Sequence, residues 1–86
     1  MEIYFKKDFI KRFKKLPQKT RRKFDERITL FKQDTQANVL HNHALHGIYM
    51  GCRSIDITGD IRAIYKIQSR NIALFIDIDN HSNLYK

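Results

Sequence analysis

The stretch CRSIDITGDIRAIYKIQSRNIALFIDID, residues 52–79, decides the fold, because its apolar residues recur at every second position. It contains three such segments, at 52–58, 61–67 and 71–79. Turn-forming residues separate them, Gly59-Asp60 first and then Ser69-Arg70-Asn71. Three strands joined by short turns predict an antiparallel meander. The segment 71–79 is the most apolar of the three and is expected to lie in the middle of the sheet.

The period of two also predicts which side chains share a face. In the second strand, one face carries Ile61, Ala63, Tyr65 and Ile67, and the other carries Arg62, Ile64 and Lys66. In the first strand, Ile55 and Ile57 alternate with Asp56. Asp56, Arg62 and Lys66 can therefore lie on one face of the sheet.

Residues before this stretch follow a helical period instead. After a short expected strand at 2–5, Phe9, Ile10, Phe13 and Leu16 recur at helical spacing, with Asp8 as the expected N-cap. Pro17 ends that helix or begins the next one, which is predicted over 17–34. Two amphipathic helices with a tight turn form a helical hairpin. The phenylalanines Phe9, Phe13, Phe24 and Phe31 are expected to be core.

The resulting element order is β-α-α-β-β-β, with a loop expected over 35–51. We predict an α+β fold in which a helical hairpin packs on an antiparallel sheet, as a single small domain over residues 1–86. Cys52, the lone cysteine, is expected to fill a small buried space and cannot form an intramolecular disulfide. A reducing cytoplasm is therefore expected. No membrane association is expected, because no apolar run is long enough for a signal peptide or a span.

Charge is the first indication of function. The net charge is +8 with a pI near 9.9, and residues 1–34 hold twelve Lys/Arg against five Asp/Glu. Residues 35–86 are nearly neutral, with five Lys/Arg against four Asp/Glu. A basic half of this kind indicates a polyanionic partner, nucleic acid first and an acidic protein second.

Three histidines lie close together in HNHALHGIYMGCR, residues 41–53. Such a cluster could bind a metal, transfer protons or line a polar loop. A zinc site would need a fourth ligand, and neither a cysteine pair nor a helical His pair is available to complete it. We therefore expect no metal and no cofactor.

Five short elements in order resemble the RelE/ParE toxins of bacterial toxin–antitoxin systems, and most of all their YafQ branch. They are His43-Ala44-Leu45-His46-Gly47, Gly51-Cys52-Arg53, Asp60, Ile64-Tyr65-Lys66 and His81-Ser82-Asn83-Leu84-Tyr85. Two positions depart from the branch: Asp56 stands where a histidine is usual, and Tyr85 where a phenylalanine is usual. The resemblance covers essentially the whole chain. It also implies that His41 and His46 are variable loop positions, so both are expected to be bystanders.

The resemblance implies a RelE-like fold and a ribosome-dependent mRNA endonuclease that works without a metal. It also implies an acidic cognate antitoxin, contacts with mRNA and ribosomal RNA on the 70S ribosome, and a toxin that is monomeric alone. His43 and His81 are the expected acid and base, because the pKa of histidine lies near neutrality. Asp60 is expected to orient a histidine or act as the base. Asp56 is the fourth catalytic candidate.

The remaining candidates concern the substrate. Arg53, Arg62 and Lys66 are expected to hold phosphate, and Tyr85 to stack on a base. Two other functions remain open at this point: a ParE-like toxin that poisons gyrase, and a basic RNA-binding module without catalysis. The histidine and aspartate set argues against gyrase poisoning, because that activity needs no proton transfer.

Overall fold

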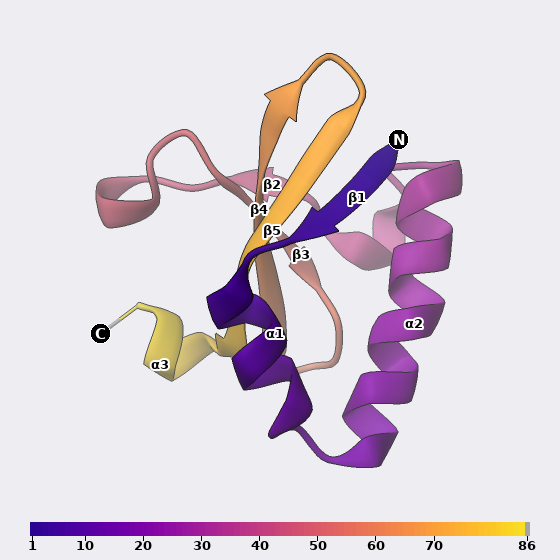
Figure 1. Ribbon diagram of the computed structural model, residues 1–86, viewed down its shortest axis with the longest axis vertical. Coiled ribbons are helices and arrows are strands. Elements are labelled where there is room, and N and C mark those ends of the chain that lie inside the picture. Colours follow the sequence, from indigo (N-terminus) through magenta and orange to yellow (C-terminus); the bar gives the residue numbers. More distant parts are fainter. Residues whose placement is uncertain (86) are drawn as a thin grey trace.

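The computed structural model describes residues 1–85 (Figure 1). Its strands are β1 (Glu2–Phe5), β2 (His43–Ala44), β3 (Arg53–Asp56), β4 (Ile61–Ser69) and β5 (Ile72–Asn80). Its α-helices are α1 (Lys7–Lys14), α2 (Gln18–Gln33) and α3 (His81–Leu84), and its 3₁₀ turns are η1 (Asn38–Leu40) and η2 (Gly47–Tyr49). The five strands form one sheet in the order β1-β5-β4-β3-β2. Within residues 1–85, no helix is long and apolar enough to cross a membrane.

The predicted meander is confirmed, with one refinement at its edge. β3, β4 and β5 pair antiparallel, as the period of two indicates, but β1 pairs with β5 in parallel. The sheet is therefore mixed. The α1–α2 hairpin and the segment after it carry the chain from β1 at one edge to β2 at the other (Figure 1). β4 is the middle strand. The most apolar segment, now β5, lies next to it between β1 and β4, so it is inside the sheet but not in the middle as expected.

The main core fills the space between the helical hairpin and one face of the sheet. Phe9 of α1 and Phe24 and Phe31 of α2 are buried, as the helical period predicts, and Phe13 packs partly buried against them. The Phe31 ring meets Tyr65 at 5.0 Å between centroids, in an edge-on arrangement. Each such ring contributes about 1.5–3 kcal/mol by leaving water. This aromatic cluster fixes α2 against β4 and β5.

Two local predictions at the helices need correction. Asp8 is not an N-cap: α1 begins at Lys7, Lys6 is its N-cap, and no side chain caps it. Asp8 lies in the first turn instead, where a carboxylate still interacts favourably with the helix dipole. Pro17 is the N-cap of α2, so it both ends the first helix and precedes the second.

The expected loop at 35–51 and the expected polar tail also contain structure. Within the loop, β2 has only two residues, too few for a period of two to be visible. In the tail, Asn80 caps α3 by accepting a hydrogen bond from the Asn83 N–H at 2.8 Å. Leu84 is buried, although the segment around it is polar. Both segments return the chain to the face of the sheet opposite the helical hairpin.

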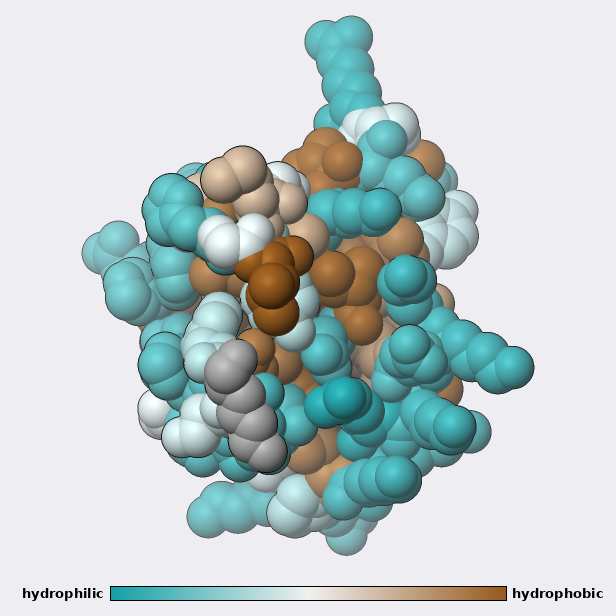
Figure 2. Space-filling model, turned by 90° about the vertical axis from the view of Figure 1, so that its left-hand side faces the viewer, coloured by the Kyte–Doolittle hydropathy of each residue, from teal (hydrophilic) through white to brown (hydrophobic). Residues whose placement is uncertain are grey.

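We call that opposite side the open face. A smaller apolar cluster covers part of it: Leu45, Ile64 and Leu84 are buried, with Tyr49, Cys52 and Ile76 half-buried around them. Cys52 is thus less buried than expected. In Figure 2, apolar surface on this side of the molecule is surrounded by hydrophilic side chains.

Candidate active site on the open face of the sheet

Strand register brings the polar candidates together on the open face. Residues directly opposite each other on neighbouring strands project to the same side of a sheet. One row across the sheet consists of His43, Ser54, Ile64 and Asp77. The next row consists of Asp56, Arg62 and Asp79. Ile64 is packed in the open-face cluster, so both rows lie on that face.

His43 is held in a defined orientation. Its Nδ1 lies 2.8 Å from the backbone oxygen of His41. A carbonyl oxygen only accepts hydrogen bonds, so Nδ1 carries the proton in the neutral ring. The other nitrogen, Nε2, then has a free lone pair. This arrangement suits a general base.

Asp56 and Arg62 form an ion pair across β3 and β4. Arg62 Nε lies 3.0 Å from Asp56 Oδ1, and both side chains are mostly buried. Arg62 Nη1 donates to the backbone oxygens of Thr58, Gly59 and Ile61 at 3.1, 3.2 and 3.4 Å. The guanidinium is therefore braced against its own turn through Nη1.

Arg53 lies apart from the other candidates. It shares the helix-facing side of β3 with Ile55, and its Nε donates to Asn42 Oδ1 at 2.8 Å. Asn42 Nδ2 in turn donates to the Tyr65 hydroxyl at 2.7 Å and to the Thr35 backbone oxygen at 2.8 Å. Arg53 therefore belongs to a network that braces the chain before β2. The structure does not bring it together with Asp56 and Arg62.

The turn after β3 and the start of α3 bring three further candidates together. The His81 N–H donates to the backbone oxygen of Asp60 at 3.1 Å. The rings of His81 and Tyr85 lie 4.7 Å apart. Tyr85 is 38% exposed, so part of its side chain is accessible to a ligand. Asp60 is an exposed turn residue whose backbone N–H is held by Thr58 Oγ1.

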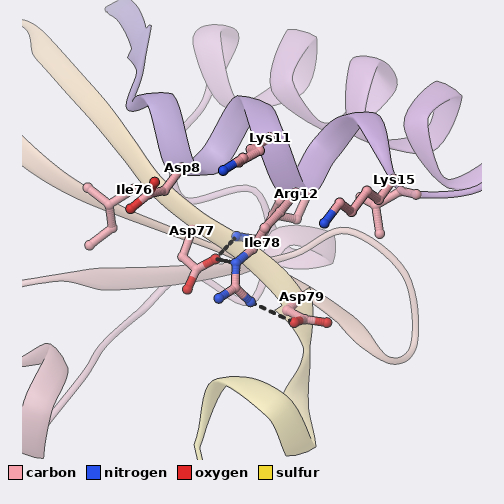
Figure 3. A pocket seen from close by; sticks show the side chains of 9 residues that line it. Asp8, Lys11, Arg12, Lys15, Ile76, Asp77, Ile78 and Asp79 are labelled. Carbon is pink, nitrogen blue, oxygen red and sulfur yellow. Dashed lines mark hydrogen bonds and ion pairs between the residues drawn. The ribbon is translucent and has the colours of Figure 1, made fainter.

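A group of charged residues beside β5 was not predicted from the sequence. Arg12 of α1 reaches over the edge of the sheet and pairs with Asp77 at 3.3 Å and Asp79 at 2.9 Å (Figure 3). A groove of about 660 Å³ runs beside them, lined by Asp8, Lys11, Arg12, Lys15, Leu16 and residues 76–79. The alternation in FIDID predicts that the two aspartates share a face. Their cationic partner could not be inferred, because it lies in a helix more than sixty residues away.

Tyr49 lies between Asp77 of β5 and the ring of Tyr85, which follows α3. Its hydroxyl donates to Asp77 Oδ2 at 3.4 Å, and its ring meets Tyr85 edge-on at 6.1 Å. Burial of the phenol and the nearby carboxylate of Asp77 raise the pKa of Tyr49 above its usual value of 10.0. Tyr49 is thus a neutral hydrogen-bond donor at physiological pH.

Lys66 is the remaining cationic candidate on the open face. Lys66 is exposed and follows Ile64 on the same side of β4, opposite Leu74 of β5. Among residues 1–85, no group of three or more His, Cys, Asp or Glu side chains is arranged to hold a metal ion. The chemistry available to this face consists of imidazoles, carboxylates, cations and exposed aromatic rings.

The comparison with known proteins points to a family of bacterial toxins. Over residues 1–86 the chain matches the family described as bacterial toxin of type II toxin-antitoxin system, YafQ. YafQ in the E. coli DinJ-YafQ toxin-antitoxin complex is 26% identical, with a TM-score of 0.76 over 99% of this chain and 97% of that one. YafQ from E. coli strain BL21(DE3) is 24% identical, with a TM-score of 0.79 over 99% and 98%.

A solved structure with lower sequence identity has the same fold. The YoeB/ParE toxin from Agrobacterium tumefaciens is 18% identical, with a TM-score of 0.77 over 94% of this chain and 99% of that one. No curated protein matches the sequence.

Proposed function

The chain belongs to the YafQ family of bacterial toxins of type II toxin–antitoxin systems, and on that premise we propose that it is an endoribonuclease that cleaves mRNA on the translating ribosome. The observation that carries the proposal is the set of side chains on the open face. Strand register and the start of α3 supply two imidazoles, a braced guanidinium and an exposed aromatic ring on this face. This is the set of groups that metal-independent RNA cleavage requires.

In the proposed reaction, the 2′-hydroxyl attacks the adjacent phosphorus. His43 Nε2 takes the hydroxyl proton, a role supported by the hydrogen bond that keeps the other nitrogen protonated. As the new O–P bond forms, the bond from phosphorus to the 5′-oxygen breaks, and His81 donates a proton to that oxygen. The products are a 2′,3′-cyclic phosphate and a 5′-hydroxyl end.

Other side chains bind or position in this proposal. Arg62 presents Nη2 to the phosphate while Asp56 holds its Nε, and Lys66 adds exposed positive charge. Tyr85 stacks on a nucleobase, which is worth on the order of 1–3 kcal/mol per base. Asp60 positions His81 through the backbone hydrogen bond. Arg53 has no direct role in this mechanism, because its contacts are with the network that braces Asn42.

The basic helices extend the contact surface beyond the reacting phosphate. Lys11 and Lys15 line the groove beside β5, next to the candidate site, and the chain as a whole carries a net charge of +8. Cations in such an array bind RNA backbone without sequence preference. Ribosomal RNA and mRNA are the proposed polyanions, which puts the site of action in the cytoplasm.

The proposed protein partner is an acidic antitoxin. The related E. coli YafQ is known in a toxin-antitoxin complex with DinJ. On this chain, an acidic partner would complement the basic helices and cover the open face, which blocks access to RNA.

The proposal is tested by expressing the chain with and without the product of the neighbouring gene and mapping mRNA 5′ ends. Codon-phased cuts that appear only without that product support the proposal. Intact mRNA with blocked replication would indicate gyrase poisoning instead, and intact mRNA without growth arrest would indicate a binding module.

Within the proposal, His81→Ala tests the assigned acid. We expect His81→Ala to lower cleavage by roughly a hundredfold or more, because positioned proton transfer contributes about 10²–10⁴-fold. His46→Ala is the matched control, since His46 is exposed and lies outside the rows of the open face. Cleavage at the normal rate by His81→Ala would rule out the assignment.

A further inference from the structure

His41, which was expected from the sequence to be a bystander, lies beside the candidate site. Its Nδ1 is 3.8 Å from Asp56 Oδ2, an ion-pair distance when the ring is protonated. Its ring centroid is 5.0 Å from that of His43. Its backbone oxygen accepts the hydrogen bond that orients His43. His41 thus touches the proposed base through its carbonyl and the site carboxylate through its ring.

The backbone directs the His41 ring to this place. His41 has φ 46° and ψ 49°, a left-handed conformation that is uncommon for a residue other than glycine. Its N–H closes the η1 turn by donating to the Asn38 oxygen at 3.1 Å. The side chain is 73% exposed, so a ligand can approach the imidazole from solvent.

Few cationic side chains near His43 and Asp56 are free to bind an RNA phosphate. The Arg62 guanidinium is engaged by Asp56 and by three backbone oxygens. Arg53 lies on the helix-facing side of the sheet, and Arg12 is held by two aspartates at the far edge. His41 is the additional side chain next to His43 that can carry a positive charge and is open to solvent.

We propose that His41 is a further catalytic residue, whose imidazolium binds the scissile phosphate of the RNA. This inference rests on the proposed function. Nδ1–H is directed to Asp56, and Nε2–H donates to a non-bridging phosphate oxygen. His41 neither gives nor takes a proton overall; it offsets the negative charge that grows on the phosphate as the 2′-oxygen attacks.

The test separates the imidazole from the backbone conformation. Asparagine tolerates the left-handed region, so His41→Asn keeps the turn and removes the ring. We expect cleavage on saturating ribosomes to slow by about tenfold or more, because groups that stabilise developing charge contribute on that scale. The thermal midpoint should stay at the wild-type value. His46→Asn, an exposed histidine in the same segment, should cleave normally.

A second variant tests the chemistry directly. His41→Gly also accepts the left-handed conformation, and free imidazole added to it should restore part of the lost rate. Normal cleavage by His41→Asn would overturn the proposal. A slowed His41→Gly that imidazole does not rescue would overturn it too, because the defect would then be structural. If the wild-type chain cleaves no mRNA on ribosomes, the proposed function fails first and this role falls with it.

Discussion

Replacing Tyr65 by phenylalanine tests whether the core holds the histidine loop in place. Tyr65 is 2% exposed, and its ring packs against Phe31 and Phe75. Its hydroxyl accepts a hydrogen bond of 2.7 Å from Asn42 Nδ2. Asn42 lies between His41 and His43 in the chain, and its Oδ1 accepts a hydrogen bond from Arg53 Nε. The substitution keeps the ring and removes one oxygen.

The expected loss of stability follows from that single bond. A hydrogen bond contributes about 0.5–1.5 kcal/mol net, and an N–H left without a partner raises the loss toward about 2 kcal/mol. Asn42 is half-buried and keeps its bond to the Thr35 oxygen at 2.8 Å, so solvent can replace part of what is lost. We therefore expect Tyr65→Phe to lower the free energy of unfolding by about 1 kcal/mol, which is a fall of roughly 4–8 °C in the thermal midpoint of a domain this size.

Urea denaturation and thermal melting measure this loss, with Tyr4→Phe as the control. Tyr4 is 52% exposed and its hydroxyl makes only a 3.4 Å contact with Glu2, so its removal should change stability by less than about 0.5 kcal/mol. A double-mutant cycle with Asn42→Ala isolates the pair. Once Asn42 is gone, Tyr65→Phe should have little further effect.

The same variant has a functional consequence under the proposed mechanism. Loosening Asn42 disturbs the chain that carries His41 and His43, so cleavage should slow even where the protein is fully folded. A Tyr65→Phe protein as stable as the wild type, or full additivity with Asn42→Ala, would refute the reasoning. Either result would mean that the hydroxyl does not brace the loop.

Three further predictions concern the edge of β5. Arg12→Gln leaves Asp77 and Asp79 without their cation, so ribosome binding should weaken in a binding experiment. The free energy of unfolding, measured by melting, should fall by no more than about 1 kcal/mol. Lys11→Gln combined with Lys15→Gln should reduce the slope of log RNA affinity against log salt concentration by roughly one to two, measured by titration at several salt concentrations. A loss of affinity confined to one RNA sequence would contradict this. The raised pKa of Tyr49 means that the folded state keeps its phenol proton more tightly, so stability should decline as the pH rises through 10; Tyr49→Phe should remove that part of the decline in alkaline denaturation curves.

Much of the fold could be predicted from sequence because it depends on local periodicity. The period of two at 52–79 predicts β3, β4 and β5, and the helical period at 9–31 predicts α1 and α2, all of which are confirmed. β2 and α3 were missed, because two and four residues are too few to establish a period. The parallel pairing of β1 was also missed, since it depends on how the hairpin crosses the sheet.

The candidate site was also predicted correctly where it depends on the alternation of residues along a strand. Asp56, Arg62 and Lys66 were expected on one face from alternation alone, and the register brings Asp56 and Arg62 into an ion pair. Arg53 had been expected to bind phosphate together with Arg62 and Lys66 because of the family motif. The same alternation places it on the helix-facing side of the sheet instead. The catalytic roles themselves remain proposals.

The sequence by itself determined the class of elements, their order, the basic charge of the helices and the residues available for chemistry. Those properties depend on spacing along the chain, which strand and helix geometry translate directly into faces. Only the tertiary structure decided which charged groups meet. Arg12 pairs with Asp77 and Asp79, which lie 65 and 67 positions further along the chain, and His41 lies near Asp56, 15 positions further along. Such pairs depend on how the elements pack and on a left-handed turn at one residue, and no periodicity in the sequence encodes them.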